Sequence, residues 1–352
     1  MGTRTLTGMR SELRSDPITG RTVIIARDRS KRPHDFARAT TLRSHASCPF
    51  CQGHESETPE PLAVYGDDGG GDWLVRVIPN KYPALSLDVG RRVRADEVEE
   101  GATERTVAGR GYGAHEVIVE SPRHVTCFSQ LDDAEALLTL RAYRDRLLAH
   151  GDNDSLRYAQ IFKNTGAAGG ASVGHVHSQL IATPFVPPEV AAELAGCRDH
   201  FQQHARCAFC DLLRRELGAA ERVVASAEHF VALCPFAARF PFETWVIPRR
   251  HQANYAALTD AELAELGPLL RSLVAATIGA SGQDAYNFLL HTAPFDTSCA
   301  DHYHWHIELF PRMLEIAGFE WGTGCFINPM PPEPASQSLR SLMQSFRARK
   351  TS

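Results

Sequence analysis

Residues 164–184, which read NTGAAGGASVGHVHSQLIATP, have the types and spacing that suit chemistry on a phosphoryl group. The first part is rich in glycine, which lets backbone N–H groups approach an anion with no Cβ in the way. His175, His177 and Gln179 follow at alternate positions, so a strand would place their side chains on one face. Imidazole, amide and backbone donors around one point could hold a phosphoryl group for attack. For the two histidines taken alone, a purely structural role is the alternative.

Two Cys-x-x-Cys pairs, Cys48/Cys51 and Cys207/Cys210, indicate metal sites. Such a pair holds two thiolates on one side of a tetrahedral ion, and two later histidines complete a Cys₂His₂ zinc site. A redox role would require a thioredoxin-like βαβ pattern, which we do not find. The remaining cysteines stand alone and are typical of small buried residues: Cys127, Cys197, Cys234, Cys299 and Cys325.

An internal repeat selects the histidines that accompany each cysteine pair. The residues around His124, followed by an acidic helix start, match those around His251 with a similar helix start. His177 and His304 each lie seven residues before a proline, with another histidine two positions upstream. We therefore expect two copies of one α+β unit, residues 1–185 and 186–352, packed as halves of one body.

The repeat yields two sets of candidate metal ligands. They are Cys48, Cys51, His124 and His175 in the first half, and Cys207, Cys210, His251 and either His302 or His304 in the second. Ions at these places would tie long loops together, so we expect a structural role. If His175 binds a metal, His177 is free to attack phosphorus, and Gln179 can donate to a phosphoryl oxygen. Arg29 and Arg32 could clamp phosphates, or could belong to a solvated basic loop.

The composition is that of a folded protein, with 43% hydrophobic and 22% charged residues among 352. A net charge of −5 gives no reason to expect nucleic acid or a membrane surface as the main partner. We find no uninterrupted apolar window of about 18 residues and no apolar core of a signal peptide at the start. We expect a cytoplasmic protein whose nine cysteines are thiols or metal ligands rather than disulfides.

Alternating strand-like and helix-like segments would position these residues. Apolar side chains at intervals of three to four predict helices over 132–150 and 259–278. Two helical pieces lie between 187 and 217, and a helix begins near 334. Strands are expected over 22–26, 73–78, 115–120, 157–163, 230–233, 244–247, 287–291 and 302–310.

These segments together resemble the galactose-1-phosphate uridylyltransferase family, of the histidine-triad superfamily, over nearly the whole chain. The matching segments are DPITGRTVIIARDRSKRP, CPFC, ESPRH, NTGAAGGASVGHVHSQ, FPFETWVIP, HTAPF and HWHIELFP. The resemblance implies an α+β fold of two fused histidine-triad-like halves, with an antiparallel half-barrel sheet flanked by helices, and a homodimer. It implies ping-pong transfer through a nucleotidyl-histidine, in which UDP-glucose and galactose 1-phosphate give UDP-galactose and glucose 1-phosphate.

The resemblance also implies roles for individual residues. His177 would be the nucleophile, Gln179 would assist it, and the first cysteine–histidine set would bind zinc. The implied substrate-binding residues are Arg29, Arg32, Asn80, Asn164, Gly170, Ser172, Phe319 and Glu320.

Three features depart from the well-known sugar-specific members. Val176 replaces a proline, Ser178 replaces a glycine, and residues 317–329 look more like the branch that includes ADP-glucose phosphorylase. That branch moves AMP from ADP-glucose to phosphate by the same histidine chemistry, and its second-site ligand matches His304, with zinc or iron as the metal. Of these two activities, uridylyl transfer is our main expectation and adenylyl transfer is the alternative. The alternatives are a histidine-triad nucleotide hydrolase and a zinc-stapled nucleotide-binding protein without turnover.

Overall fold

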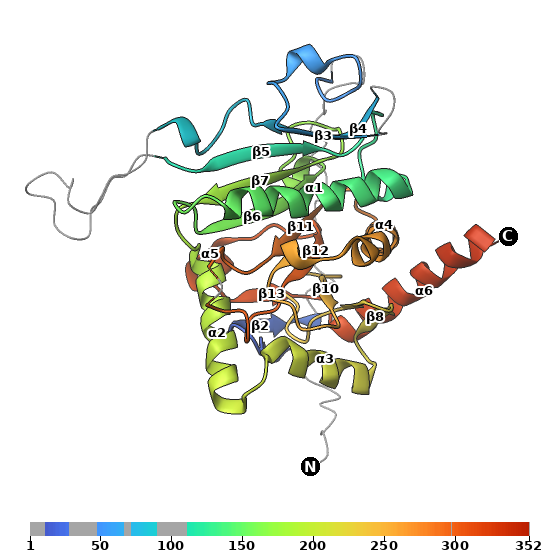
Figure 1. The fold of residues 1–352 in the computed structure, drawn as a ribbon. Coiled ribbons are helices and arrows are strands. Elements are labelled where there is room, and N and C mark those ends of the chain that lie inside the picture. The colour runs from blue at the N-terminus through green and yellow to red at the C-terminus, as the bar shows by residue number, and fades with distance from the viewer. Residues whose placement is uncertain (1–10, 28–47, 67–71, 90–110, 297, 352) are drawn as a thin grey trace, which may run out of the picture.

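The computed structural model describes residues 11–27, 48–66, 72–89, 111–296 and 298–351. Most strands form one ten-stranded antiparallel sheet (Figure 1). Its spatial order is β3 (Ala63–Gly66), β4 (Trp73–Pro79), β5 (Ala114–Val119), β7 (His177–Thr183), β6 (Tyr158–Thr165), β11 (Tyr286–His291), β12 (His306–Pro311), β10 (Thr244–Pro248), β9 (Phe230–Leu233) and β8 (Val223–Ser226).

The two halves of the sequence meet inside this sheet. β6 pairs with β11, and Asn164 lies directly opposite Asn287 across that junction. A small second sheet contains β1 (Glu12–Ser15), β2 (Thr22–Ile25) and β13 (Phe326–Asn328), with β13 parallel to β2. The small sheet thus joins segments from both ends of the chain.

Three helices, α1 (Asp133–Gly151), α4 (Asp260–Ser281) and α6 (Pro332–Thr351), pack together over one face of the large sheet. α2 (Pro188–His204) and α3 (Ala208–Ala219) pack over strands of the second half on the opposite face, where Trp245 and Ile247 of β10 join their core. Figure 1 shows both helices beside the later strands. The predicted α+β fold, a large antiparallel sheet flanked by helices, is confirmed.

The part of the sequence repeat that lies at the starts of α1 and α4 reflects helix capping. Asp132 accepts a hydrogen bond from the backbone N–H of Glu135 at the start of α1, and Thr259 does the same for Glu262 at the start of α4. Each is a capping box that satisfies N–H groups without helical partners. α4 is long and apolar enough to cross a membrane by composition alone, but its apolar side chains pack into the core between α1 and α6.

The alternation of β7 decides which side chains reach the site. Leu180 and Ala182 join the core beneath α1, and the hydroxyl of Ser178 lies against that of Tyr143 on that helix. His177 and Gln179 therefore lie on the opposite face of the sheet.

Two expected strands begin later in the structure. β7 begins at His177, so His175 precedes the strand rather than belonging to it. The strand expected over 302–310 begins at His306, because Cys299 accepts hydrogen bonds from the N–H groups of His302 and Tyr303 in a turn. His175 and His304, the later histidine beside each cysteine pair, thus both lie in the segment that leads into the strand.

Candidate active site and metal centres

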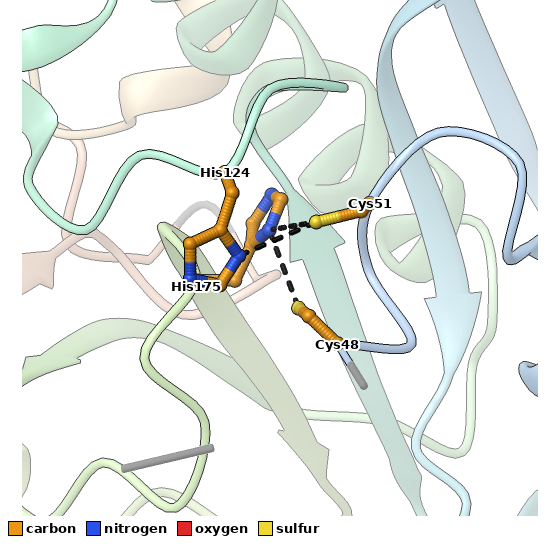
Figure 2. Close-up of side chains that lie close together, drawn as sticks. All are labelled: Cys48, Cys51, His124 and His175. Atoms are coloured by element: carbon orange, nitrogen blue, oxygen red, sulfur yellow. Dashed lines mark hydrogen bonds between the residues drawn. The ribbon is translucent and has the colours of Figure 1, made fainter. Parts of the chain in front are cut away.

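The first cysteine–histidine set converges in space, as Figure 2 shows. His175 Nδ1 lies 3.5 Å from Cys48 Sγ and 3.6 Å from Cys51 Sγ, and His124 Nδ1 lies 3.3 Å from Cys51 Sγ. In a tetrahedral zinc site with ordinary bond lengths, sulfur and nitrogen ligands are about 3.5 Å apart. The spacing of these four side chains fits a zinc ion.

The surroundings of this set favour metal binding. His175 Nε2 donates to the carbonyl of Ser121 at 2.8 Å, which leaves the lone pair of Nδ1 directed at the thiols. Burial lowers the pKa of His175 to about 4, so the ring is neutral. Burial, together with the neighbouring Cys48, raises the pKa of the Cys51 thiol to about 11. A bound cation would stabilise the two adjacent thiolates that these surroundings otherwise oppose.

The second set converges in the same way. Cys210 Sγ lies 3.6 Å from Nδ1 of both His251 and His304, and Cys207 Sγ lies 3.8 Å from His304 Nδ1. His304 Nε2 donates to the carbonyl of Pro248 at 2.9 Å, as His175 does to Ser121. The second group can therefore hold a metal ion as the first can.

Of the two alternatives at the second centre, His304 faces the cysteines, whereas the ring of His302 lies against Phe201. The register taken from the prolines, which pairs His304 with His177, is wrong by two residues. In space His304 corresponds to His175, and His306 corresponds to His177, because His306 Nδ1 contacts the carbonyl of His304 as His177 Nδ1 contacts that of His175. The prolines at the far strand ends are not equivalent positions.

A hydrogen bond fixes the tautomer of the buried His177 ring. Its Nδ1 lies 2.7 Å from the carbonyl oxygen of His175, which can only accept, so Nδ1 carries the proton and Nε2 the lone pair. Burial, with a contribution from the charge of Lys163, lowers the pKa of His177. The ring edge packs near Phe50, with centroids 5.4 Å apart. A neutral imidazole of this tautomer is competent to attack phosphorus through Nε2.

A buried ion pair beneath β7 holds the backbone of this histidine. Lys163 Nζ donates to Glu120 Oε2 at 2.6 Å and to the carbonyl of His177 at 2.7 Å. Ser178 and Tyr143 donate to the other oxygen of Glu120. This network was not predicted from the sequence, although a lysine at a core-facing strand position, as Lys163 is on β6, is unusual enough to be a signal.

Gln179 is oriented by its neighbours. The backbone N–H of Ala84 donates to His115 Nδ1 at 3.1 Å, so His115 Nε2 carries the ring proton and donates to Gln179 Oε1 at 2.8 Å. Asn80 Nδ2 lies 3.5 Å from the same oxygen. The side-chain oxygen of Gln179 is thus engaged, and the NH₂ end is the donor that can serve a phosphoryl oxygen.

The glycine-rich loop lies between β6 and β7. Gly166 and Gly170 have φ values of +70° and +86°, a conformation that favours glycine. A Cβ at Gly170 would lie 3.5 Å from Asn164 Nδ2. Ser172 is exposed at the end of the loop, three residues before His175. The loop, Asn164 and Gln179 share the sheet face of His177.

The remaining candidate substrate residues lie elsewhere. Phe319 is 45% exposed on α5 (Gly318–Thr323), and Glu320 makes a local hydrogen bond with the backbone N–H of Ala317. Within the described residues of this single chain, neither Phe319 nor Glu320 forms a hydrogen bond with His177. Arg29 and Arg32 lie outside the described residues.

A third cluster consists of Glu193 on α2, His291 on β11 and His306 on β12, with ligand atoms within 4.8 Å of one another. His291 Nδ1 and His306 Nε2 each lie 3.2 Å from an oxygen of Glu193. Glu308, two residues beyond His306, forms an ion pair with Arg239. This cluster was not predicted from the sequence, because no short spacing motif connects its members.

Comparisons with known proteins identify enzymes that this chain resembles over nearly its whole length. The chain is 38% identical to ADP-glucose phosphorylase of Arabidopsis thaliana over 337 residues, covering 94% of this chain and 93% of that protein. It is 29% identical to galactose-1-phosphate uridylyltransferase of Thermotoga maritima over 337 residues, covering 94% and 98%. The solved Arabidopsis thaliana ADP-glucose phosphorylase with bound ADP-glucose has a TM-score of 0.80 at 36% identity, covering 94% of this chain and 98% of that one. A solved uridylyltransferase has a TM-score of 0.72 at 26% identity, covering 95% and 99%.

Fold, site and relatives together define an enzyme of the nucleotidyltransferase and phosphorylase class related to galactose-1-phosphate uridylyltransferase. Within this class the chain belongs to the family described as the domain of unknown function DUF4921, whose sequence profile matches residues 64–351. The predicted resemblance, including its features of the ADP-glucose phosphorylase branch, is confirmed.

Proposed function

We propose that the protein transfers a nucleoside monophosphate through a covalent nucleotidyl-His177 intermediate. The observation that supports this most directly is the hydrogen bond from His177 Nδ1 to the carbonyl of His175, which leaves Nε2 as the attacking atom. Nε2 attacks the α-phosphorus of a nucleoside diphosphate hexose, and the bond from that phosphorus to the bridging oxygen breaks. Hexose 1-phosphate leaves with the bridging oxygen, and the acceptor phosphate then displaces the histidine.

The groups around His177 match the charge changes of this reaction. When Nε2 bonds to phosphorus the ring becomes cationic, and the carbonyl of His175 stabilises the proton on Nδ1. Gln179, Asn164 and the N–H groups of the loop are donors for the phosphoryl oxygens. Because His175 is also a metal ligand candidate, the first centre would position the carbonyl that orients the nucleophile. A zinc ion there would supply a rigid tetrahedral anchor.

For the substrates we propose ADP-glucose as donor and phosphate as acceptor, giving ADP and glucose 1-phosphate. The support is the higher similarity to ADP-glucose phosphorylase, at 38% identity and a TM-score of 0.80. Exchange of UMP between UDP-glucose and galactose 1-phosphate, our first expectation from the sequence, is the second candidate. It is supported by the 29% identity to a uridylyltransferase over nearly all of both chains.

Labelling of the protein tests both the chemistry and the donor. The holoenzyme is incubated with ADP-glucose or UDP-glucose labelled at the α-phosphorus, and the denatured protein is counted. We expect a label that is labile in acid and stable in alkali, from ADP-glucose in preference to UDP-glucose. His177→Ala should abolish the label, whereas the control His204→Ala, an exposed histidine on α2, should keep it.

The outcomes separate the alternatives. A label that persists in His177→Ala would show that another residue is the nucleophile. Binding of either sugar nucleotide without any label would favour the nucleotide-binding protein without turnover. A preference for UDP-glucose, with galactose 1-phosphate as acceptor, would establish the second candidate instead of the first.

Three further proposals accompany this function. Zinc at the first centre and zinc or iron at the second are supported by the ligand spacing. A homodimer and a cytoplasmic location, both expected from the sequence, stay predictions.

A further inference from the structure

The glycine-rich loop of the first half, residues 166–170, packs directly against the second half. A Cβ at Gly166 would lie 2.8 Å from Ala285 Cβ, and one at Gly169 would lie 3.0 Å from the carbonyl oxygen of Tyr286. Arg312 Nε, beyond the end of β12, donates to the carbonyl of Ala168 at 3.2 Å. The loop therefore has little freedom to move without changing its contacts with β11.

Asn287 on β11 makes the most directed of these contacts. Its Nδ2 lies 2.8 Å from the carbonyl oxygen of Gly169 and 2.8 Å from Oδ1 of Asn164. The side chain is buried, with 8% of the residue exposed. Asn164 lies directly opposite on β6, at the junction of the two halves.

These contacts determine which end of each amide faces which neighbour. The carbonyl of Gly169 can only accept, so the atom of Asn287 that faces it is the NH₂ group. The second proton of that group goes to Asn164, so Oδ1 of Asn164 is the atom that faces Asn287. Asn164 Nδ2 consequently points away from Asn287 and towards Gly170 in the loop.

We propose that Asn287 is a positioning residue through which the second half orients the phosphate-binding donors of the first. This rests on the proposed nucleotidyl transfer through His177. Asn287 does not donate to the substrate. It holds the NH₂ group of Asn164 and the loop N–H groups in place before the substrate arrives, so that they need not reorganise during attack.

The test measures the first half-reaction, the rate at which label from the α-phosphorus of the donor reaches His177. Asn287→Ala should slow this single-turnover rate about 100-fold, the size expected when reacting groups are misplaced by about 1 Å, with a smaller change in the half-saturating donor concentration. Gln160→Ala is the matched control, because Gln160 Nε2 donates to the carbonyl of Leu290 at 2.9 Å across the same two strands, away from the loop. It should stay within about twofold of wild type, as expected when positioning of the reacting groups is intact.

Two further variants separate positioning from mere packing. Asn287→Asp keeps the shape but directs a carboxylate oxygen at two carbonyl-type oxygens, so it should be at least as slow as Asn287→Ala. In an Asn164→Ala background, Asn287→Ala should slow the reaction much less than in wild type, because part of its effect passes through Asn164. An active Asn287→Asp variant, or the same slowing in both backgrounds, would overturn the proposal.

Failure of the proposed function is distinguishable from failure of this inference. If wild type acquires no label from any sugar nucleotide, the proposed function fails. The positioning role is then decided by a crystal structure of Asn287→Ala. We expect the amide of Asn164 to rotate or the 166–170 loop to shift, and an unchanged loop and amide would refute the role.

Discussion

Removing the ammonium group of Lys163 should be among the most damaging single changes in this protein. Lys163 and Glu120 are both fully buried, and their charged atoms are 2.6 Å apart. Lys163→Met leaves the carboxylate of Glu120 buried without a counter-charge, which costs about 3–5 kcal/mol in comparable cases. The change also removes the donor to the carbonyl of His177, so labelling of that histidine should slow as well.

Urea unfolding of matched variants measures this cost. The double variant Lys163→Met/Glu120→Gln removes both charges, and should recover about half or more of the lost free energy of unfolding. Arg271→Met, which breaks an ion pair with the largely exposed Asp133, should cost less than about 1 kcal/mol. The reasoning is refuted if Lys163→Met costs no more than Arg271→Met, or if the double variant is no more stable than the single one.

Three other predictions concern acid stability, metal content and the proposed catalysis. Burial would raise the pKa of Glu116, but hydrogen bonds and charges from His150 and Arg146 outweigh it and lower the pKa overall. This carboxylate therefore stabilises the fold at pH values above its unfolded pKa of about 4.3. The contribution is lost as the pH falls through the lower pKa of the folded state. The difference in unfolding free energy between wild type and Glu116→Gln should therefore be constant near neutral pH and shrink below about pH 4; a constant difference down to pH 3 would contradict it. Elemental analysis of protein purified without chelators should find about two metal ions per chain, and Cys51→Ser should lose about one; unchanged content would argue against the first centre. Gln179→Ala should lower the rate of labelling about 100-fold with little change in donor affinity, and a change in affinity alone would assign Gln179 to binding.

Local spacing was informative wherever chemistry depends on residues close together in the chain. The Cys-x-x-Cys pairs, the His175/His177/Gln179 alternation and the capped starts of α1 and α4 are all short patterns. Strand geometry and helix capping act over a few residues, so these patterns predicted the elements without tertiary information, and they made His177 the candidate nucleophile.

Local spacing did not show which residues of the two repeated strands, β7 and β12, correspond to each other. A count of residues to the nearest proline suggested that His304 corresponds to His177, whereas the hydrogen bonds of β7 and β12 show that His306 does. A register shift of two keeps every side chain on the same face, so the hydrophobic pattern cannot exclude it. Only the backbone contacts of the folded strands distinguish the two alignments.

The sequence by itself determined the chemistry that the site can offer: a histidine beside a glycine-rich loop, and cysteine pairs with later histidines. The tertiary structure alone decided how that chemistry is held. The Lys163–Glu120 pair spans 43 residues, and the Asn287–Asn164 contact spans 123. Such contacts depend on which strands become neighbours in the sheet, and this is decided by burial over the whole chain rather than by any local pattern.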